Sequence, residues 1–464
     1  MKNTTTSLDE TDEVKIKNPK ALLTALCFVL MMSVMNGTMF NIAIPDIAKT
    51  FQLMPSEVSW VMTGYIMVYA VGALMYGKLA DYYPFKTLIT IGLTIFAIGS
   101  LFGFFAQSYL MVLIARVIQA SGGAMLPALV FLAPIRYFPK ERGKVLGIIS
   151  SVMAFASGVG PIVGGFIAGF LDWKFLFLTS ACIIIMLPFL RKNLPDEKKR
   201  EAHVDFIGAF FVAGTIATLL IGITMESLIS IGGMLFFLTC FFVRSKYVEY
   251  PFIPPHFFKN KKFVATIITS FFGVACLFGL MFTLPIMLRD VHELTTMQIG
   301  LVLFPGAICA AIIGQFGGRL VDSKGSRFVL FLSMMILSTG FFVISISTGL
   351  HPIVLSLSII LAYMCFPLVQ ASTADLLANI LPNKETGVGM GVFNLMNFVA
   401  GSLSGAIIGK VLDIYSPEKS FNPFAQKGGS AAYSDVFLMF VFIVLGAYLF
   451  FRTFYENKKR SLEA

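Results

Sequence analysis

Long apolar runs recur along the whole chain and constrain its fold more than any other feature. Each run of roughly 18 to 25 residues is long enough to cross a bilayer as an α-helix. Hydrophobic residues make up 57% of the 464 residues and charged residues only 13%, well below the share of a soluble protein. The alternating apolar and polar residues of an outer-membrane β-barrel are absent from the sequence. The chain is therefore predicted to be an all-α polytopic membrane protein.

The apolar runs predict fourteen transmembrane helices. They lie near residues 21–44, 57–79, 86–106, 109–134, 143–169, 173–190, 206–225, 227–244, 262–288, 296–317, 327–348, 352–376, 386–412 and 434–455. We expect a tail (1–20), a six-helix half (21–190), a linker with two inserted helices (191–261), a second six-helix half (262–455) and a final tail (456–464).

The basic residues predict how these helices are oriented. If the N-terminus is cytoplasmic, the segments on that side hold 28 Lys and Arg residues and the outer segments hold six. Such a bias predicts that both termini are cytoplasmic. The chain itself is expected to lie in the cell membrane. The net charge of +10 is then explained by these loops, and we expect no nucleic-acid partner.

Two cytoplasmic turns repeat one another and relate the two halves. They are "GKLADYYPFK" (77–86) and "GRLVDSKGSR" (318–327). The matching residues, predicted to form a conformational latch, are Gly77, Asp81, Lys86, Gly318, Asp322 and Arg327. Each carboxylate can accept hydrogen bonds from a neighbouring helix N-terminus or pair with adjacent bases. The alternative for a single copy is a solvated loop anion. Paired halves with a site between them suit alternating access.

A single arginine, Arg116, interrupts the apolar run of residues 110–135. A guanidinium at membrane depth costs several kcal/mol, so such a residue normally faces a cavity or a partner. Gln119 lies on the same helix face, and Asn36 and Asn41 are polar at comparable depth in the first helix. Two interpretations remain: a hydrogen-bond hub joining helices, or a cavity residue that tunes protonation or substrate binding.

The fifth predicted helix carries a face of small residues. These are Gly158, Gly160, Gly164 and Gly165, placed around Pro161. Small residues let helices approach and slide, and the proline with its glycines permits a bend. The face either seals and bends between two access states or only packs tightly.

Several motifs together resemble the major facilitator superfamily. The loop pattern "GxLaDxxGxR", "MNGTMFNIAIP" (35–45), "RVIQASGGA" (116–124) and "GIISSVMAFASGVGPIVGG" (147–165) occur in order at the corresponding helices. The chain resembles the fourteen-helix drug:proton antiporters. Within that family it is similar to the Gram-positive tetracycline exporters of the K and L type and their phenicol-exporting relatives, on the segments "PALVFLAPIRYFPKERGKVLG" and "RDVHELTTMQIGLVLFPG". The resemblance implies alternating-access efflux driven by a proton gradient, with no bound cofactor or metal. Pro84 replaces the usual glycine of the first loop.

Membrane-embedded acids are scarce compared with what this resemblance implies. The family motif carries Asp where this chain has Asn36, and the tetracycline exporters carry Glu near Ser157 and Gly401, where none stands here. Asp375 alone lies inside an apolar helix; it either carries a proton or reaches interfacial water. Strongly cationic substrates are therefore disfavoured. The residues expected to line a transport cavity or to couple ions are Arg116, Gln119, Asn36, Asn41, Asp375, Asn394 and Asn397.

Three functions are weighed by these sequence features. The first is proton-coupled efflux of small amphipathic drugs by a monomer in contact with membrane lipids, with substrate and protons as its partners. The second is export of an envelope lipid or metabolite, since an acid-poor cavity with one arginine suits an anionic head group. The third, a non-transporting sensor, is disfavoured by the repeated loop motifs. An enzyme is not expected, because the four histidines lie near helix ends and no catalytic motif or phosphate loop occurs.

Overall fold

The computed structural model is helical throughout the residues it describes. These are residues 18–53, 55–58, 60–197, 205–224, 227–294, 296–382, 385–414, 421–423 and 430–456, and they contain no strand. Thirteen helical spans within them are long and apolar enough to cross a membrane. The fourteenth predicted span corresponds to α10 (Phe206–Thr224), whose residues Phe206–Leu219 form a shorter apolar helix. The all-α prediction is confirmed.

The first half of the chain folds into one bundle of helices. Its elements are α1 (Pro19–Phe51), α2 (Pro55–Val58), α3 (Trp60–Ala80), α4 (Phe85–Phe104), α5 (Tyr109–Gly123), α6 (Met125–Tyr137), η1 (Pro139–Glu141), α7 (Arg142–Phe170), α8 (Phe175–Ala181), η2 (Cys182–Met186) and α9 (Leu187–Asn193). The peripheral pair is α10 and α11 (Leu228–Tyr247).

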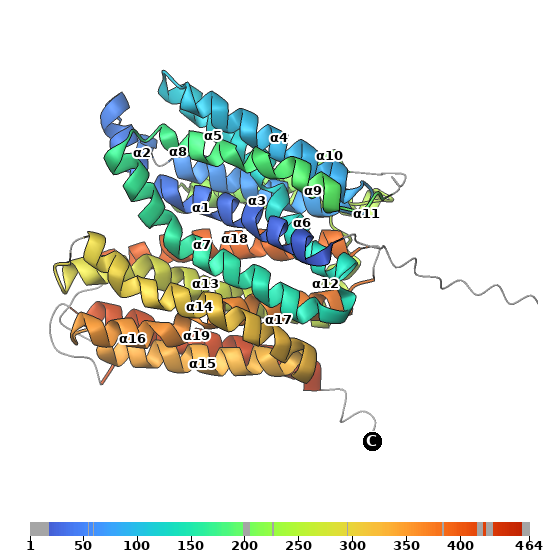
Figure 1. Cartoon of the computed structure of the whole chain (residues 1–464). Coiled ribbons are helices and arrows are strands. Elements are labelled where there is room, and N and C mark those ends of the chain that lie inside the picture. Colours follow the sequence, from blue (N-terminus) through green and yellow to red (C-terminus); the bar gives the residue numbers. More distant parts are fainter. Residues whose placement is uncertain are drawn as a thin grey trace, which may run out of the picture.

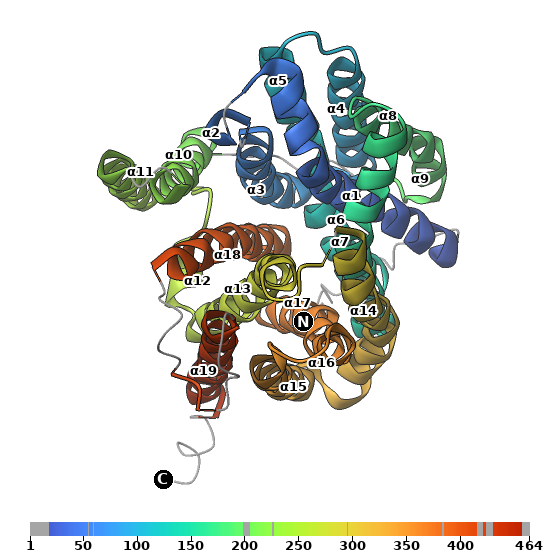
Figure 2. The same cartoon turned by 90° about the vertical axis from the view of Figure 1, so that its left-hand side faces the viewer.

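The second half repeats the arrangement. Its elements are α12 (His256–Lys259), α13 (Lys261–Asp290), α14 (Thr296–Lys324), α15 (Ser326–Ser347), α16 (Pro352–Tyr363), α17 (Cys365–Ile380), α18 (Thr386–Ile414) and α19 (Ala431–Glu456). The two halves lie one above the other in Figure 1, and Figure 2 shows α10 and α11 at the edge, beside α3 and α18. The seam between the halves is formed mainly by α7 against α14 and α17, and by α18 against α3 and α6.

Two predicted spans break in the middle, at related positions. The span near 109–134 divides at Ala124, and the span near 352–376 divides at Met364. Pro127 and Pro367 follow these breaks by three residues. A proline has no N–H for the carbonyl four residues earlier, so the helical hydrogen-bond ladder is interrupted there.

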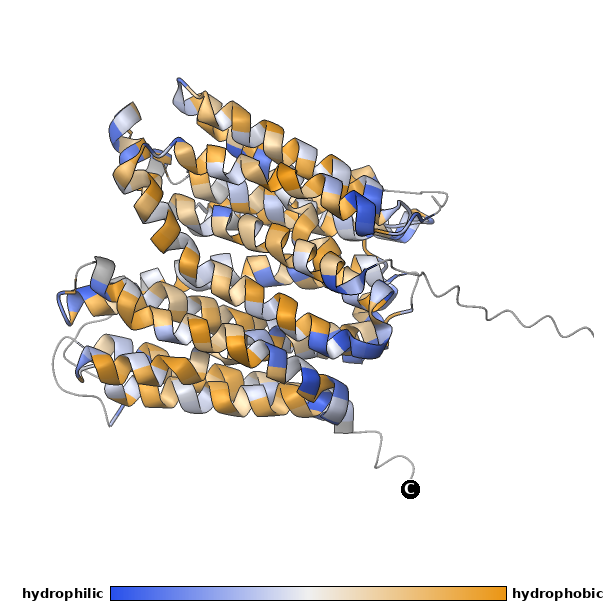
Figure 3. Cartoon of the chain, in the orientation of Figure 1, coloured by the Kyte–Doolittle hydropathy of each residue, from blue (hydrophilic) through white to orange (hydrophobic). Residues whose placement is uncertain are grey.

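Polar residues concentrate at the two ends of the bundle, and apolar residues fill its middle (Figure 3). We call one end the basic end: it holds the start of α1, the end of α3 and the end of α19. The two repeated turns, 77–86 and 318–327, both lie at this end.

Candidate functional site

Asp322 joins the two halves at the basic end. It stands near the end of α14, and its carboxylate accepts hydrogen bonds from the backbone N–H groups of Gly143 (2.7 Å) and Lys144 (2.8 Å). These groups belong to the first turn of α7, where backbone N–H groups are unpaired and the helix dipole is positive. The C-terminal half therefore caps a helix of the N-terminal half.

Asp81 makes the same contact in the opposite direction. It follows α3, and its carboxylate accepts hydrogen bonds from the N–H groups of Gly387 (3.0 Å) and Val388 (3.1 Å) in the first turn of α18. Arg136 lies 3.6 Å away on its other side. The repeated sequence motif thus produces two related junctions across the seam.

The Asp81 carboxylate is nearly buried at its junction, and burial dominates its electrostatics. Removal from water raises the pKa of Asp81 from 3.8 to about 7, against the opposing effects of the Arg136 guanidinium and of the Val388 and Gly387 N–H groups. We therefore expect Asp81 to change its protonation state near neutral pH.

The basic residues of the repeated turns do not pair with these two carboxylates. Lys86 instead binds Asp196 within its own half, with 2.7 Å between Nζ and Oδ1. The Arg327 guanidinium lies 4.7 Å from the ring centre of Tyr455. The expected pairing with adjacent bases is supplied for Asp81 by Arg136, which lies outside the motif.

Glycines let the helices of each junction approach closely. Gly77 lies so near α18 that a Cβ atom would fall 2.9 Å from the Cα of Gly391. A Cβ on Gly318 would lie 2.8 Å from the Cα of Lys144, and one on Gly147 would lie 2.7 Å from the Cα of Gly318. Gly147, which the sequence analysis did not single out, belongs to this interface. Any larger side chain at these places would separate the halves.

A third contact across the seam was not anticipated. Arg142, the first residue of α7, places Nε 2.6 Å from Asp375 Oδ1 in α17 and donates from Nη2 to Asn379 Oδ1 at 2.7 Å. Asn379 in turn donates to Asp375 Oδ2 at 2.9 Å. The carboxylate of Asp375, a residue that is 5% exposed, is therefore held by a cation from the other half.

Arg116 is enclosed at the centre of the N-terminal half. Only 1% of the residue is exposed. Its Nη1 donates to Asn36 Oδ1 (3.0 Å) and Gln119 Oε1 (2.7 Å), and its Nε donates to the carbonyl of Val61 (3.2 Å). It thus joins α1, α3 and α5 as a hydrogen-bond hub.

Two further layers support this hub. The guanidinium lies between the rings of Phe40 and Tyr65, 4.1 and 3.9 Å from their centres, in a cation–π arrangement. Asn36 donates to Ser180 of α8 at 2.7 Å, and Gln119 donates to Ser100 of α4 at 2.8 Å. The partners recorded for Arg116 in the described residues are all neutral, so its charge is balanced by dipoles and rings.

The other residues expected in a cavity divide between the two halves. Asn397 donates to Gln370 at 3.0 Å and accepts from Ser270 at 3.2 Å, forming a buried network in the C-terminal half. Asn394 is buried but donates to the Met390 carbonyl of its own helix. The side chain of Asn41 lies outside the described residues.

The glycines of α7 beyond the junction pack against two neighbours. A Cβ on Gly158 would lie 2.7 Å from Ala307 Cβ in α14, and one on Gly164 would lie 2.7 Å from the Met39 carbonyl in α1. Gly160 approaches Thr38 in the same way, and Gly165 is half-buried. The helix continues through Pro161, whose side chain lies outside the described residues.

Comparison with known proteins identifies the same architecture. The Major Facilitator Superfamily matches residues 26–405. The riboflavin transporter RibZ of Clostridioides difficile is 28% identical, and the match covers 80% of this chain and 83% of RibZ. The multidrug efflux pump SdrM of Staphylococcus aureus is 26% identical, and the match covers 86% of this chain and 91% of SdrM. The structure of the human organic anion transporter MFSD10 superposes with a TM-score of 0.69 at 14% identity, covering 94% of this chain and all of that one, which shows a shared fold.

Proposed function

Because the chain belongs to the Major Facilitator Superfamily, we propose that it exports small amphipathic drugs that are not strongly cationic, of the tetracycline or phenicol type, in exchange for protons. It would work in the cell membrane as a monomer, with the basic end and both termini in the cytoplasm. The family membership and the many apolar spans make it a multi-pass membrane transport protein. The multidrug pump among its relatives supports a drug substrate.

The observation that carries this proposal is the matched pair of junctions. Each half caps one helix of the other half through a carboxylate, Asp81 or Asp322, and glycines bring the crossing helices into backbone contact. Helix caps made by two carboxylates, beside helices with small side chains, suit two rigid halves that separate at the basic end and rejoin. We therefore assign this conformation to the state closed toward the cytoplasm.

The charge distribution supports the substrate class. The buried guanidinium of Arg116 has neutral partners, and the carboxylate that is buried inside a span among the described residues, that of Asp375, pairs with Arg142. A cation desolvated between the halves would find the Asp375 carboxylate already paired and would be repelled by the enclosed charge of Arg116, so its desolvation would be poorly compensated. Neutral and electron-rich ligands avoid this penalty, and the anionic group of a zwitterion offsets part of it.

Transport in proteoliposomes tests the proposal directly. With an imposed pH gradient, tetracycline and chloramphenicol should move against their own concentration gradients, and ethidium should move poorly. The Asp81→Asn/Asp322→Asn double variant is the matched control, since it retains size and insertion but loses both charged caps. Drug movement that ignores the pH gradient, or preferential transport of ethidium, would contradict the proposal.

A metabolite is the second candidate substrate, because a riboflavin transporter is among the relatives of similar identity and coverage. Riboflavin in the same proteoliposomes separates the two possibilities. Saturable riboflavin transport without drug transport would favour this alternative.

A further inference from the structure

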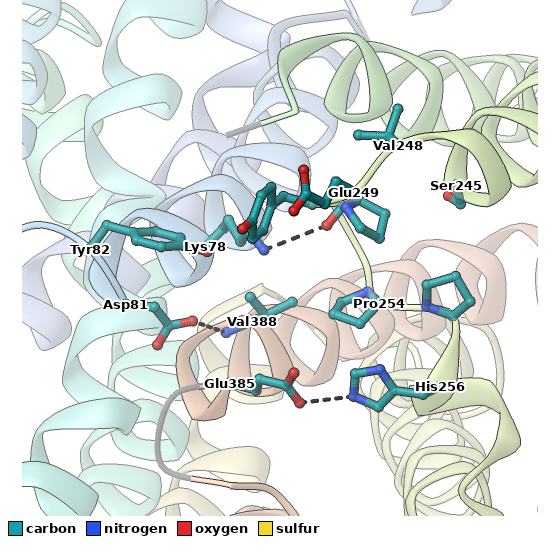
Figure 4. Close-up of a pocket in the computed structure, with 13 residues that line it drawn as sticks. Lys78, Asp81, Tyr82, Ser245, Val248, Glu249, Pro254, His256, Glu385 and Val388 are labelled. Carbon is teal, nitrogen blue, oxygen red and sulfur yellow. Dashed lines mark hydrogen bonds and ion pairs between the residues drawn. The ribbon is translucent and has the colours of Figure 1, made fainter. Parts of the chain in front are cut away.

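The segment that leaves the inserted pair, residues 248–260, runs across the Asp81 junction. It connects α11 to α13 and contains α12. A pocket of about 360 Å³ lies beneath it, and Figure 4 shows that this pocket is lined by Lys78 and Asp81 from the N-terminal half, by Glu385 and Val388 from the C-terminal half, and by Glu249 and His256 from the segment itself. Val388 donates one of the two backbone hydrogen bonds that Asp81 accepts at this junction.

The segment contacts the C-terminal half at two points. His256 Nε2 lies 2.9 Å from Glu385 Oε2, just before α18. Phe257 is 1% exposed and its ring centre lies 4.9 Å from that of Phe263 in α13. Because the segment continues directly into α13, we expect it to move with this half.

Its contact with the N-terminal half includes a long hydrogen bond. The Lys78 ammonium, on a residue that is only 5% exposed, donates to the Pro251 carbonyl at 3.5 Å, the limit of a hydrogen bond. Among the described residues, the Lys78 ammonium donates this one hydrogen bond. The ammonium also lies 5.7 Å from the ring centre of Tyr82. The carboxylates of Asp81, Glu385 and Asp205 also attract this ammonium. Water that enters on opening can replace its long hydrogen bond to Pro251 and hydrate the charge, so we expect the two surfaces to part here.

The inserted helices hold the segment in place over the seam. α10 contacts both α3 and α18. Arg244 of α11 pairs with Asp205 at 2.8 Å, which closes the two helices together at the basic end. Phe252 is fully buried and packs close to Gly208 at the start of α10.

We propose that residues 248–260 form a strap over the seam, fixed to the C-terminal half by His256 and Glu385, and that the contact of Lys78 with Pro251 is the point at which the strap releases when the basic end opens. The inserted pair, α10 and α11, would then regulate the opening of the basic end. This inference rests on the proposed alternating access, but its test measures the conformation of the basic end and not drug movement.

Two cross-links distinguish the fixed end of the strap from its releasing end. Cysteines replace Lys78 and Pro251 in one protein, and His256 and Glu385 in a matched second protein, each in a full-length chain whose native cysteines are removed. A cleavable bis-maleimide joins each pair. Nitroxides on non-thiol amino acids at Lys192 and Lys324, which are exposed on different halves at the basic end, report the opening distance. Asp322→Asn in all samples weakens the other junction so that the open state is populated.

We expect cross-linking Lys78 to Pro251 to abolish the long-distance population and cleavage to restore it, while cross-linking His256 to Glu385 leaves that population unchanged. If the Lys78 variant does not fold, cysteines at Tyr82 and Tyr250 provide a second link between the same two parts. Opening that survives the link to the N-terminal half, or that is lost with the link inside the C-terminal half, would overturn the strap. A protein without cross-links that never shows the long distance would instead refute alternating access itself.

Discussion

Protonation of Asp81 should close the basic end as the pH falls. In the closed junction, burial raises the pKa of Asp81 from 3.8 to about 7, whereas an open junction returns the carboxylate to water and to its ordinary value. The closed state therefore binds the proton more tightly. Its stabilisation by protonation is complete below pH 3.8 and is lost as the pH rises through about 7.

The size of the effect follows from these two values. Between about pH 7.5 and pH 5.5, the closed state should gain about 2 kcal/mol relative to the open state, or roughly twentyfold in their ratio. The nitroxide pair at Lys192 and Lys324 measures this ratio directly as a function of pH. Substitution of Asn for Asp81 keeps the size of the side chain and removes its titration, so we expect a flat pH profile.

Asp322→Asn is the matched control, since it removes the carboxylate of the related junction and leaves Asp81 in place. It should alter the ratio of states but keep the response to pH. The reasoning is refuted if Asp81→Asn retains a pH response as large as that of the parent protein. A response of the opposite sign would mean that the loss of an accepted N–H bond on protonation outweighs burial.

Three further predictions concern other contacts. Arg142→Asp and Asp375→Arg should each destabilise the closed state relative to the open state by about 1.5–3 kcal/mol, and the double variant should recover much of this loss in the same distance measurement. A double variant that recovers nothing would show that the pair does not hold the closed state. Arg116→Ala should destabilise the folded protein by about 2–4 kcal/mol because buried partners lose their donor, measured as thermal unfolding in detergent; an unchanged melting temperature would exclude the hub. Gly147→Ala should reduce transport by forcing α7 from α14, whereas Gly300→Ala, where a Cβ meets nothing within 4 Å, should be neutral.

The fold could be predicted largely because apolar length is a local property. Every run of the sequence long enough to span appears as helix, and the repeated turns around Asp81 and Asp322 mark the two halves. The breaks at Ala124 and Met364 were missed, although Pro127 and Pro367 carried the signal. The exact helix ends depend on packing as well as on composition.

The site was less accessible to sequence reasoning because its contacts join distant residues. Arg142 and Asp375 are 233 positions apart, and the sequence around either residue does not indicate that they pair. The same holds for His256 and Glu385, 129 positions apart. Arg116 was recognisable as an unusual charge, and its partners Gln119 and Asn36 were among those expected, but only tertiary structure shows how completely it is enclosed.

The distribution of charge bears on where ion coupling acts. The centre of the N-terminal half holds a guanidinium balanced by neutral groups, while the described carboxylates that bind across the seam, Asp81, Asp322 and Asp375, all lie toward the basic end. Opening that end necessarily separates each of them from its partner in the other half. A carboxylate that loses its partner must be hydrated or protonated. Under the proposed proton exchange, these junctions are where we expect protonation to act, since the chain has Asn36 in place of a membrane-embedded acid.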